Sequence, residues 1–281
     1  MVNSIYKENL FSEKTVLITG GGTGIGFRTA RELAQLGATV FLAGRTAEKL
    51  NVSADFIRKE NGNAHPITCN IRDEENVQDC IEKVLELTKK SGFGEGRIDY
   101  LVNNAGGQFP SPAENISAKG WKAVIETNLS GTFNVSKEVF NKSMKQYGGA
   151  IVNVLANFRN GFPMLSHTGA ARAGVDNLTK SLAVEWGRYG VRINSVAPGV
   201  IQTSGLDKYP EEFKSFILGF GKNNQANRLG TEAEIAAGII FLLSPAASFI
   251  TGETLKIDGA ESLYSPVYPP ADHKNFYKFE D

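Results

Sequence analysis

The chain has 281 residues, of which 41% are hydrophobic, so it can bury a large core and suits one α/β domain over residues 1–281. Thirty basic and thirty acidic side chains cancel, and no long run carries one sign, which argues against a nucleic-acid groove or a polybasic membrane patch. Residues 1–13 are polar and no run of about 18 apolar residues occurs, so neither a signal peptide nor a membrane helix is expected.

Cys69 and Cys80 are the only cysteines, and their spacing matches no metal motif, so no metal site is predicted. Two thiols in a chain of this length favour a reducing compartment, and both are expected to be buried structural thiols. Residues 278–281 do not spell the peroxisomal Ser-Lys-Leu address. A cytoplasmic location is therefore the expectation, and the family resemblance described below leaves a peroxisomal location as the alternative.

Short β-branched runs alternate with amphipathic stretches of helical length along the chain. Strands are predicted at Thr15–Thr19, Thr39–Ala43, His65–Cys69, Ile98–Val102, Ala150–Leu155, Arg192–Val196 and Thr254–Ile257. Helices are predicted at Ile25–Leu36, Glu74–Lys90, Ala118–Tyr147, Thr168–Tyr189 and Glu232–Leu243, and glycines stand at the stop positions 37, 148 and 190. This alternation predicts a doubly wound Rossmann fold, with seven parallel strands in one sheet and helices on both faces.

The predicted core spans about residues 14–259. Two segments lack its regular alternation of strands and helices. Residues 202–229 are less periodic and are expected to lie over the carboxyl ends of the strands as a substrate lid. Residues 262–281 hold three prolines and several aromatics and predict an extended tail, which either packs on a neighbouring subunit or frays.

The first predicted strand runs into a glycine-rich turn and then directly into a helix. Backbone N–H groups and the helix dipole meet a pyrophosphate in such a turn, and glycine permits the close approach. A dinucleotide is therefore expected at Gly20, Gly22, Thr23, Gly24, Ile25 and Gly26.

Arg45 follows the second predicted strand, where no acidic side chain is placed to bond a ribose 2′-hydroxyl. A guanidinium there suits a 2′-phosphate, which favours NADP(H) over NAD(H). Lys49 either adds charge or is a solvated helix residue. Arg28 is expected to be an ordinary helix residue.

Four motifs in order resemble the short-chain dehydrogenase/reductase superfamily from about Lys14 to Gly259: the glycine turn, Asn-Asn-Ala-Gly at 103–106, Asn128 within 127–133, and Ala-Pro-Gly at 197–199. The resemblance implies that Asn104, Ala105 and Gly106 lie beside the adenine ribose and that Asn70 and Ile71 flank the adenine. It also implies that the nicotinamide is approached by Pro198, Gly199, Val200 and Ile201.

Within the superfamily, residues 104–114, 167–175 and 243–252 are similar to the peroxisomal trans-2-enoyl-CoA reductases and, less closely, to the 2,4-dienoyl-CoA reductases. This resemblance implies an acyl-CoA substrate in fatty acid metabolism and a homotetramer built on the helices at 118–147 and 168–189. Two features depart from it: Asp176 stands where such reductases can carry a Tyr, and the sorting tripeptide is absent.

The superfamily's Tyr-x-x-x-Lys is replaced by Thr168-x-x-x-Arg172, and the serine that usually precedes it is missing from 154–157. Threonine does not titrate near neutral pH, and arginine stays protonated, so Arg172 can hold cofactor ribose or phosphate groups but cannot relay protons. Carbonyl reduction needs such a relay. Reduction of an enoyl thioester first needs an oxyanion donor instead, which can contribute about 3 kcal/mol.

Thr168 and Arg172 are the predicted catalytic pair, with Asn128 positioning water or the active-site helix. His167 is a weaker candidate because a lone histidine is more often packed than catalytic, and Ser166 is expected to be a helix N-cap. Phe109, Phe158 and Phe162 line either an acyl slot or the core. Lys208, Lys214 and Lys222 meet CoA phosphates or lie in solvent.

The predicted function is NADPH-dependent reduction of the C=C bond of trans-2-enoyl-CoA thioesters. One alternative is a 2,4-dienoyl-CoA reductase or a terpenoid or alcohol dehydrogenase of the same superfamily. A non-enzymatic NADP(H)-binding pseudoenzyme is the other, because the usual Tyr, Lys and Ser are all missing.

Overall fold

The computed structural model describes residues 4–90, 96–158, 160–203, 205–206, 211–263, 267, 269–273 and 275–280. Within these residues, seven strands form one parallel sheet in the order β3-β2-β1-β4-β5-β6-β7. The strands are β1 (Thr15–Thr19), β2 (Thr39–Gly44), β3 (Asn63–Thr68), β4 (Tyr100–Asn103), β5 (Gly149–Val154), β6 (Val191–Pro198) and β7 (Thr254–Ile257). The strand order reverses between β1 and β4, where doubly wound sheets bind ligands. The predicted fold is confirmed.

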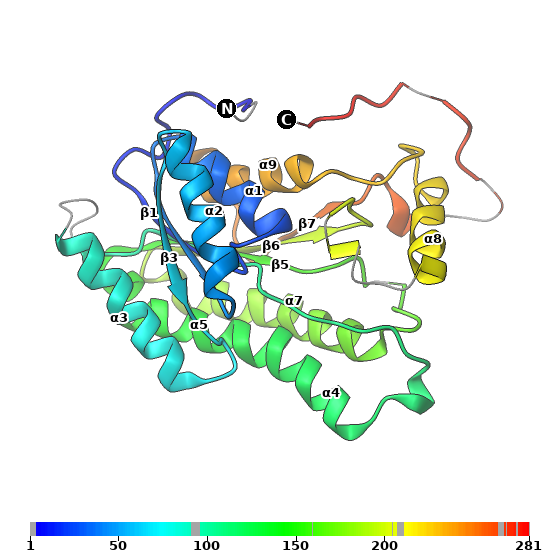
Figure 1. The fold of residues 1–281 in the computed structure, drawn as a ribbon, viewed down its shortest axis with the longest axis horizontal. Helices are drawn as coiled ribbons and strands as arrows, with labels where there is room; N and C mark the ends of the chain where they lie inside the picture. Colours follow the sequence, from blue (N-terminus) through cyan, green and yellow to red (C-terminus); the bar gives the residue numbers. More distant parts are fainter. Residues whose placement is uncertain are drawn as a thin grey trace.

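Helices cover both faces of the sheet (Figure 1). One face carries α1 (Gly24–Gln35), α2 (Ala47–Lys59) and α9 (Glu232–Leu243). The other carries α3 (Glu74–Lys90), α4 (Ala118–Ile125), α5 (Gly131–Val139), the short α6 (Lys145–Tyr147) and α7 (Ser166–Gly187). Each layer has its own hydrophobic core, and the strand side chains alternate between the two.

The predicted helix over 118–147 contains two π-helical turns, Glu126–Ser130 and Phe140–Met144. A π-turn holds an extra residue, so it shifts the side chains that follow to a new face, and such turns are frequent at functional sites. Asn128 lies in the first of these turns and is fully buried.

Some boundaries differ from the predictions. Ile98 lies before β4 because its N–H donates to the hydroxyl of Ser143 rather than to a neighbouring strand. Ser166 is the first residue of α7, and Leu165 occupies the N-cap without a side-chain bond, so the N-cap expected at Ser166 was wrong. The helix α2 was not predicted, although Leu50, Ala54 and Ile57 bury one of its faces at helical spacing.

The two cysteines are buried, as expected: Cys69 is 2% exposed and Cys80 is 3% exposed. Asp176 is engaged in local structure, since it accepts a 2.6 Å hydrogen bond from the hydroxyl of Thr254 and pairs with Lys180. It therefore stabilises the contact between α7 and β7 rather than facing an active site.

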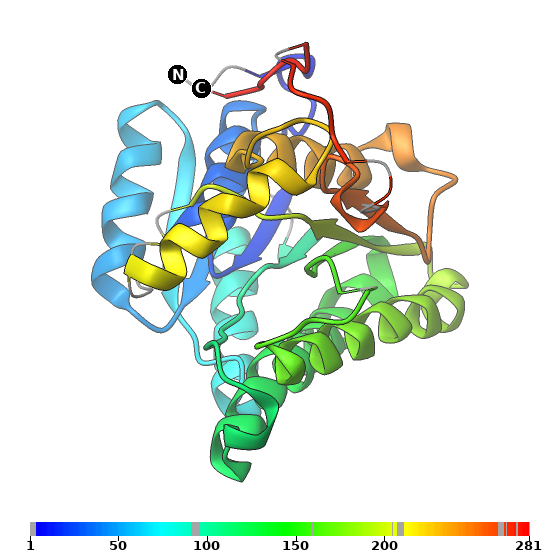
Figure 2. The ribbon, with the colours of Figure 1, turned by 90° about the vertical axis from the view of Figure 1, so that its right-hand side faces the viewer.

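The predicted lid contains a further helix, α8 (Glu211–Gly219), which crosses the carboxyl-end side of the sheet (Figure 2). Residues 277 and 279 of the tail are hydrogen-bonded to the chain itself. The hydroxyl of Thr231 donates to the carbonyl of Phe279 at 2.6 Å, and Nη2 of Arg228 donates to the carbonyl of Tyr277 at 2.8 Å. These two bonds hold the tail against the segment that leads into the N-terminus of α9.

Candidate active site

The glycine turn after β1 is held against the end of β4. The side-chain amide of Asn104 donates to the carbonyls of Thr19 and Gly20 at 3.1 and 3.2 Å. Gly20 has a φ of +66°, and a Cβ atom at Gly26 would lie 2.5 Å from the carbonyl oxygen of Gly20. Only glycine fits at these two positions, so the turn can bring α1 close to the strand ends.

The first turn of α1 suits an anion. Thr23 takes the N-cap position but makes no side-chain capping bond, and the first turn carries no acidic residue. The backbone N–H groups of the first turn, which have no acceptor within the helix, can therefore bind a ligand such as a pyrophosphate. Gly22, Gly24 and Ile25 are partly exposed beside them.

Arg45 and Lys49 are both exposed after β2, where a 2′-phosphate would be reached. At the end of β3, the N–H of Asn70 donates to Asn76 at 2.6 Å, which fixes the turn that follows. The Ile71 side chain is 7% exposed and packs in the core against Gly131. The Ile71 side chain is therefore part of the core.

Arg28 is not an ordinary helix residue, contrary to expectation. It is 4% exposed, and its Nη1 lies 2.6 Å from a carboxylate oxygen of the fully buried Glu32. The hydroxyl of Ser4 also donates to Glu32, at 2.8 Å. This face of α1 is covered by α9 and the N-terminal segment, and the i, i+4 spacing of Arg28 and Glu32 was the available signal.

Asn128 anchors the loop after β4. Its Nδ2 donates to the carbonyls of Gly107 and Val124 at 2.7 and 2.9 Å, and its Oδ1 accepts from the N–H of Gly107 at 3.3 Å. In this structure the side chain therefore positions the loop that follows Gly106.

Thr168 and Arg172 lie one turn apart on the buried side of α7, 1% and 9% exposed. Nη1 of Arg172 donates to the carbonyl of Val154 at 2.8 Å, and Nη2 reaches the space above Gly106. Its Nε finds no partner within the part of the chain that the structure describes. Burial lowers the pKa of Arg172 to about 10, so the guanidinium is still a cation at neutral pH.

The Thr168 hydroxyl lies 3.5 Å from Nδ1 of His167, too far for a strong O–H donor, so it remains available. His167 is fully buried, and its Nδ1 accepts the backbone N–H of Thr168 at 2.9 Å. The proton of a neutral ring then belongs on Nε2, which has no partner among the described residues. Phe109 packs edge-on against this ring at 4.6 Å.

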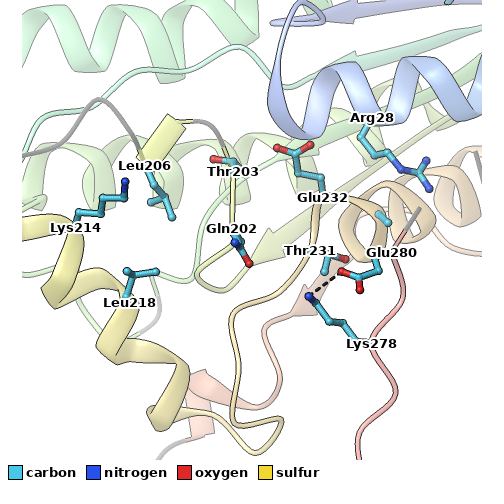
Figure 3. A pocket seen from close by; sticks show the side chains of 11 residues that line it. Arg28, Gln202, Thr203, Leu206, Lys214, Leu218, Thr231, Glu232, Lys278 and Glu280 are labelled. Atoms are coloured by element: carbon cyan, nitrogen blue, oxygen red, sulfur yellow. Dashed lines mark ion pairs between the residues drawn. The ribbon is translucent and has the colours of Figure 1, made fainter. Parts of the chain in front are cut away.

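A cavity of about 730 Å³ lies between α8, the start of α9 and the tail (Figure 3). Its lining comes from five separate parts of the chain: Arg28, Gln202, Thr203, Leu206, Lys214, Leu218, Thr231, Glu232, Ala233, Lys278 and Glu280. Of the predicted lid lysines, Lys214 lines it, Lys222 is exposed elsewhere, and Lys208 lies outside the described residues.

The segment after β6 is divided between two cavities. Gly199, Val200 and Ile201 line a smaller cavity of about 220 Å³, together with Phe276 and Tyr277 of the tail. Pro198 is the last residue of β6 and is buried. That tail residues wall both cavities could not be predicted, because only the folded chain brings residues 276–280 to the end of β6.

Known proteins resemble this chain in sequence and fold. The family model described as enoyl-(acyl carrier protein) reductase matches residues 20–260. A peroxisomal 2,4-dienoyl-CoA reductase from Danio rerio, named as (3E)-enoyl-CoA-producing, is 38% identical over 265 residues, which cover 93% of this chain and 85% of the relative.

Two solved structures are also similar. A citronellol catabolism dehydrogenase from Pseudomonas aeruginosa PAO1 is 46% identical with a TM-score of 0.81, covering 92% of this chain and 99% of that one. An actinorhodin polyketide ketoreductase, solved with NADPH, is 26% identical with a TM-score of 0.82, covering 92% and 100%. No helix among the described residues is long and apolar enough to cross a membrane. The chain belongs to the short-chain dehydrogenase/reductase family and is an oxidoreductase.

Proposed function

We propose that this oxidoreductase uses NADPH to reduce the C=C bond of a trans-2-enoyl-CoA thioester. The observation that carries the proposal is the pair Thr168 and Arg172, a buried hydroxyl and a buried cation beside Gly106. This pair can stabilise negative charge, but neither member exchanges a proton near neutral pH. It therefore suits a reaction that gathers charge on an oxygen better than one that needs a proton relay.

NADPH supplies a hydride when bound. Hydride addition at C3 moves the π electrons of the double bond onto the thioester, so that its carbonyl oxygen becomes an enolate oxygen. The Thr168 hydroxyl donates a hydrogen bond to that oxygen, and the Arg172 cation stabilises its charge. The enolate then takes a proton from water at C2, which leaves a saturated acyl thioester.

The structure has groups that can bind the phosphates and a ribose of NADPH. The uncapped first turn of α1 would hold the pyrophosphate, and Gly26, which lacks a side chain, would let it come close. The exposed Arg45 would hold the 2′-phosphate. The unpartnered Nε of Arg172 would bond a ribose hydroxyl. The NADPH bound by the polyketide ketoreductase supports the choice of NADP(H).

Two other substrates are favoured by the relatives. A 2,4-dienoyl-CoA is suggested by the Danio rerio relative, whose (3E)-enoyl product requires hydride at C5 and a proton at C2. That reaction places charge on the same thioester oxygen, so Thr168 and Arg172 would serve it equally. Citronellol is suggested by the Pseudomonas neighbour, but its oxidation removes a hydroxyl proton, which this pair does not accept.

One assay separates these functions. NADPH oxidation is followed at 340 nm with crotonyl-CoA, a longer trans-2-enoyl-CoA and a 2,4-dienoyl-CoA, and NADP reduction is followed with citronellol. The proposal expects the highest kcat/KM with a trans-2-enoyl-CoA. A higher value with the dienoyl thioester identifies the second candidate, and turnover of citronellol alone refutes both.

We also propose a homotetramer in a reducing, cytoplasmic setting. Apolar side chains are exposed on the outer helices, among them Trp121 on α4, Phe133 on α5 and Val184 on α7, which is 83% exposed. A second copy would cover them. The mass in solution by light scattering tests this proposal.

A further inference from the structure

We infer that the 730 Å³ cavity receives the pantetheine and diphosphate arm of the CoA thioester, and that Lys278 of the tail contacts a phosphate. This inference rests on the proposed function. Beyond the proposed function, the inference assigns a specific part of the substrate to the cavity and a substrate-binding role to the tail.

The cavity has the position and size for such an arm. Gln202 and Thr203 in its wall follow directly on Pro198–Ile201, the segment expected at the nicotinamide. Its volume lies within the roughly 300–1,000 Å³ typical of small-molecule sites. Its lining side chains stand on α8 at one side and on the tail at the other (Figure 3).

The chemistry of the lining distinguishes the two arms of the substrate. An acyl chain needs a continuous apolar wall, whereas Lys214 and Lys278 bring cations to this cavity from α8 and the tail. The guanidinium of Arg28, also in the wall, is paired with Glu32, and the carboxylates of Glu232 and Glu280 line the same cavity. Figure 3 shows Lys214 on the α8 side and Lys278 on the tail side. Cations suit phosphate oxygens, and the amide of Gln202 suits the pantetheine amides.

Lys278 is held in place through the backbone on either side of it. The carbonyl of Tyr277 accepts from Arg228 at 2.8 Å, and the carbonyl of Phe279 accepts from Thr231 at 2.6 Å. Arg228 is itself paired with Glu234 at 2.9 and 2.5 Å. The position of Lys278 at the cavity therefore depends on the hydrogen-bonded backbone of its neighbours and not on its own side chain.

Glu280 is the present partner of the lysine. Nζ of Lys278 lies 2.7 Å from Oε2 of Glu280, and the two side chains are 42% and 57% exposed. Such an exposed pair contributes little to stability, so a phosphate can replace the carboxylate. Glu280 then repels the same phosphate, which predicts opposite effects for Lys278 and Glu280 variants.

The test compares one enoyl group on two carriers, CoA and N-acetylcysteamine, which lacks phosphate. Lys278→Gln is expected to raise KM for the CoA thioester about tenfold, with kcat and the N-acetylcysteamine kcat/KM unchanged. Glu280→Gln is expected to lower KM for the CoA thioester two- to threefold. Asp272→Ala changes an exposed tail residue outside both cavities and serves as the matched control.

Three outcomes overturn the inference while the proposed function stands. In the first, Lys278→Gln changes the kinetics equally for both thioesters. In the second, Lys278→Gln and Glu280→Gln change KM for the CoA thioester in the same direction. In the third, Lys278→Gln weakens NADPH binding and leaves KM for the CoA thioester unchanged. If the wild-type enzyme turns over neither thioester, the proposed function fails. Calorimetric binding of the CoA thioester then decides the inference, because Lys278→Gln must still bind it about tenfold more weakly than the wild type.

Discussion

Gly106 lies so close to Arg172 that a Cβ atom at position 106 would overlap Nη2 of the guanidinium, and it would stand 2.8 Å from Oδ1 of Asn128. The loop after β4, the π-turn and α7 thus meet at one glycine. Because Arg172 is also bonded to Val154, it cannot withdraw without losing that hydrogen bond.

Gly106→Ala is therefore expected to displace Arg172 and lower kcat/KM about 10- to 100-fold, since small misplacements of catalytic groups are costly. The measurement is steady-state kinetics with the enoyl-CoA substrate, together with the melting temperature. Gly107→Ala is the matched control, because a Cβ atom there meets nothing within 4 Å. Equal losses in both variants would mean that loop flexibility, and not the Arg172 contact, sets the rate.

Thr168→Val removes the hydroxyl and keeps the side-chain shape. If the hydroxyl is the oxyanion donor, kcat should fall about 10²- to 10³-fold with little change in KM, as for other single oxyanion donors. Thr168→Ser should retain most of the activity because it keeps the O–H group. A fully active Thr168→Val enzyme would transfer the donor role to another group, and Nε2 of His167, which has no partner among the described residues, is one candidate.

Arg45→Ala should weaken the preference for NADPH. The exposed guanidinium contacts only the 2′-phosphate in the proposed binding mode, so kcat/KM for NADPH should fall about 100-fold, close to 3 kcal/mol, with NADH little changed. The ratio of the two kcat/KM values is measured. Lys49→Ala is the control and should change this ratio less, and an unchanged ratio in Arg45→Ala would place the 2′-phosphate elsewhere.

The sheet and the glycine turn could be predicted because their signals are local. β-branched runs of strand length and a glycine turn between strand and helix are visible in a few residues, and all seven strands were found. The close packing of this turn has the same local cause, since a Cβ atom at Gly20 or Gly26 would meet the side chain of Asn104.

The cavity could not be predicted because its wall is assembled from distant segments. Arg28 and Lys278 stand at opposite ends of the chain, and no periodicity links them. The π-turn at Asn128 was also hidden, because one extra residue in a turn leaves the surrounding helical pattern almost unchanged. The sequence thus singled out Thr168 and Arg172, which are one turn apart on a single helix, but not a cavity whose wall is built from five parts of the chain.

Glu60 provides a pH-dependent test of the packing between α1 and α2. Its carboxylate accepts two hydrogen bonds from Arg31, at 2.6 and 2.8 Å, and these hold the pKa of Glu60 at about 2, below the ordinary 4.5. Because folding lowers this pKa, the pair stabilises the fold above about pH 4.5, and the stabilisation is lost as the pH falls toward 2. Glu60→Gln should therefore be less stable than the wild type by about 1 kcal/mol at pH 7. Urea unfolding at pH 7, 4 and 3 should show this difference shrinking with acid, and a difference that stays constant over this range would mean that the Glu60 charge does not stabilise the fold.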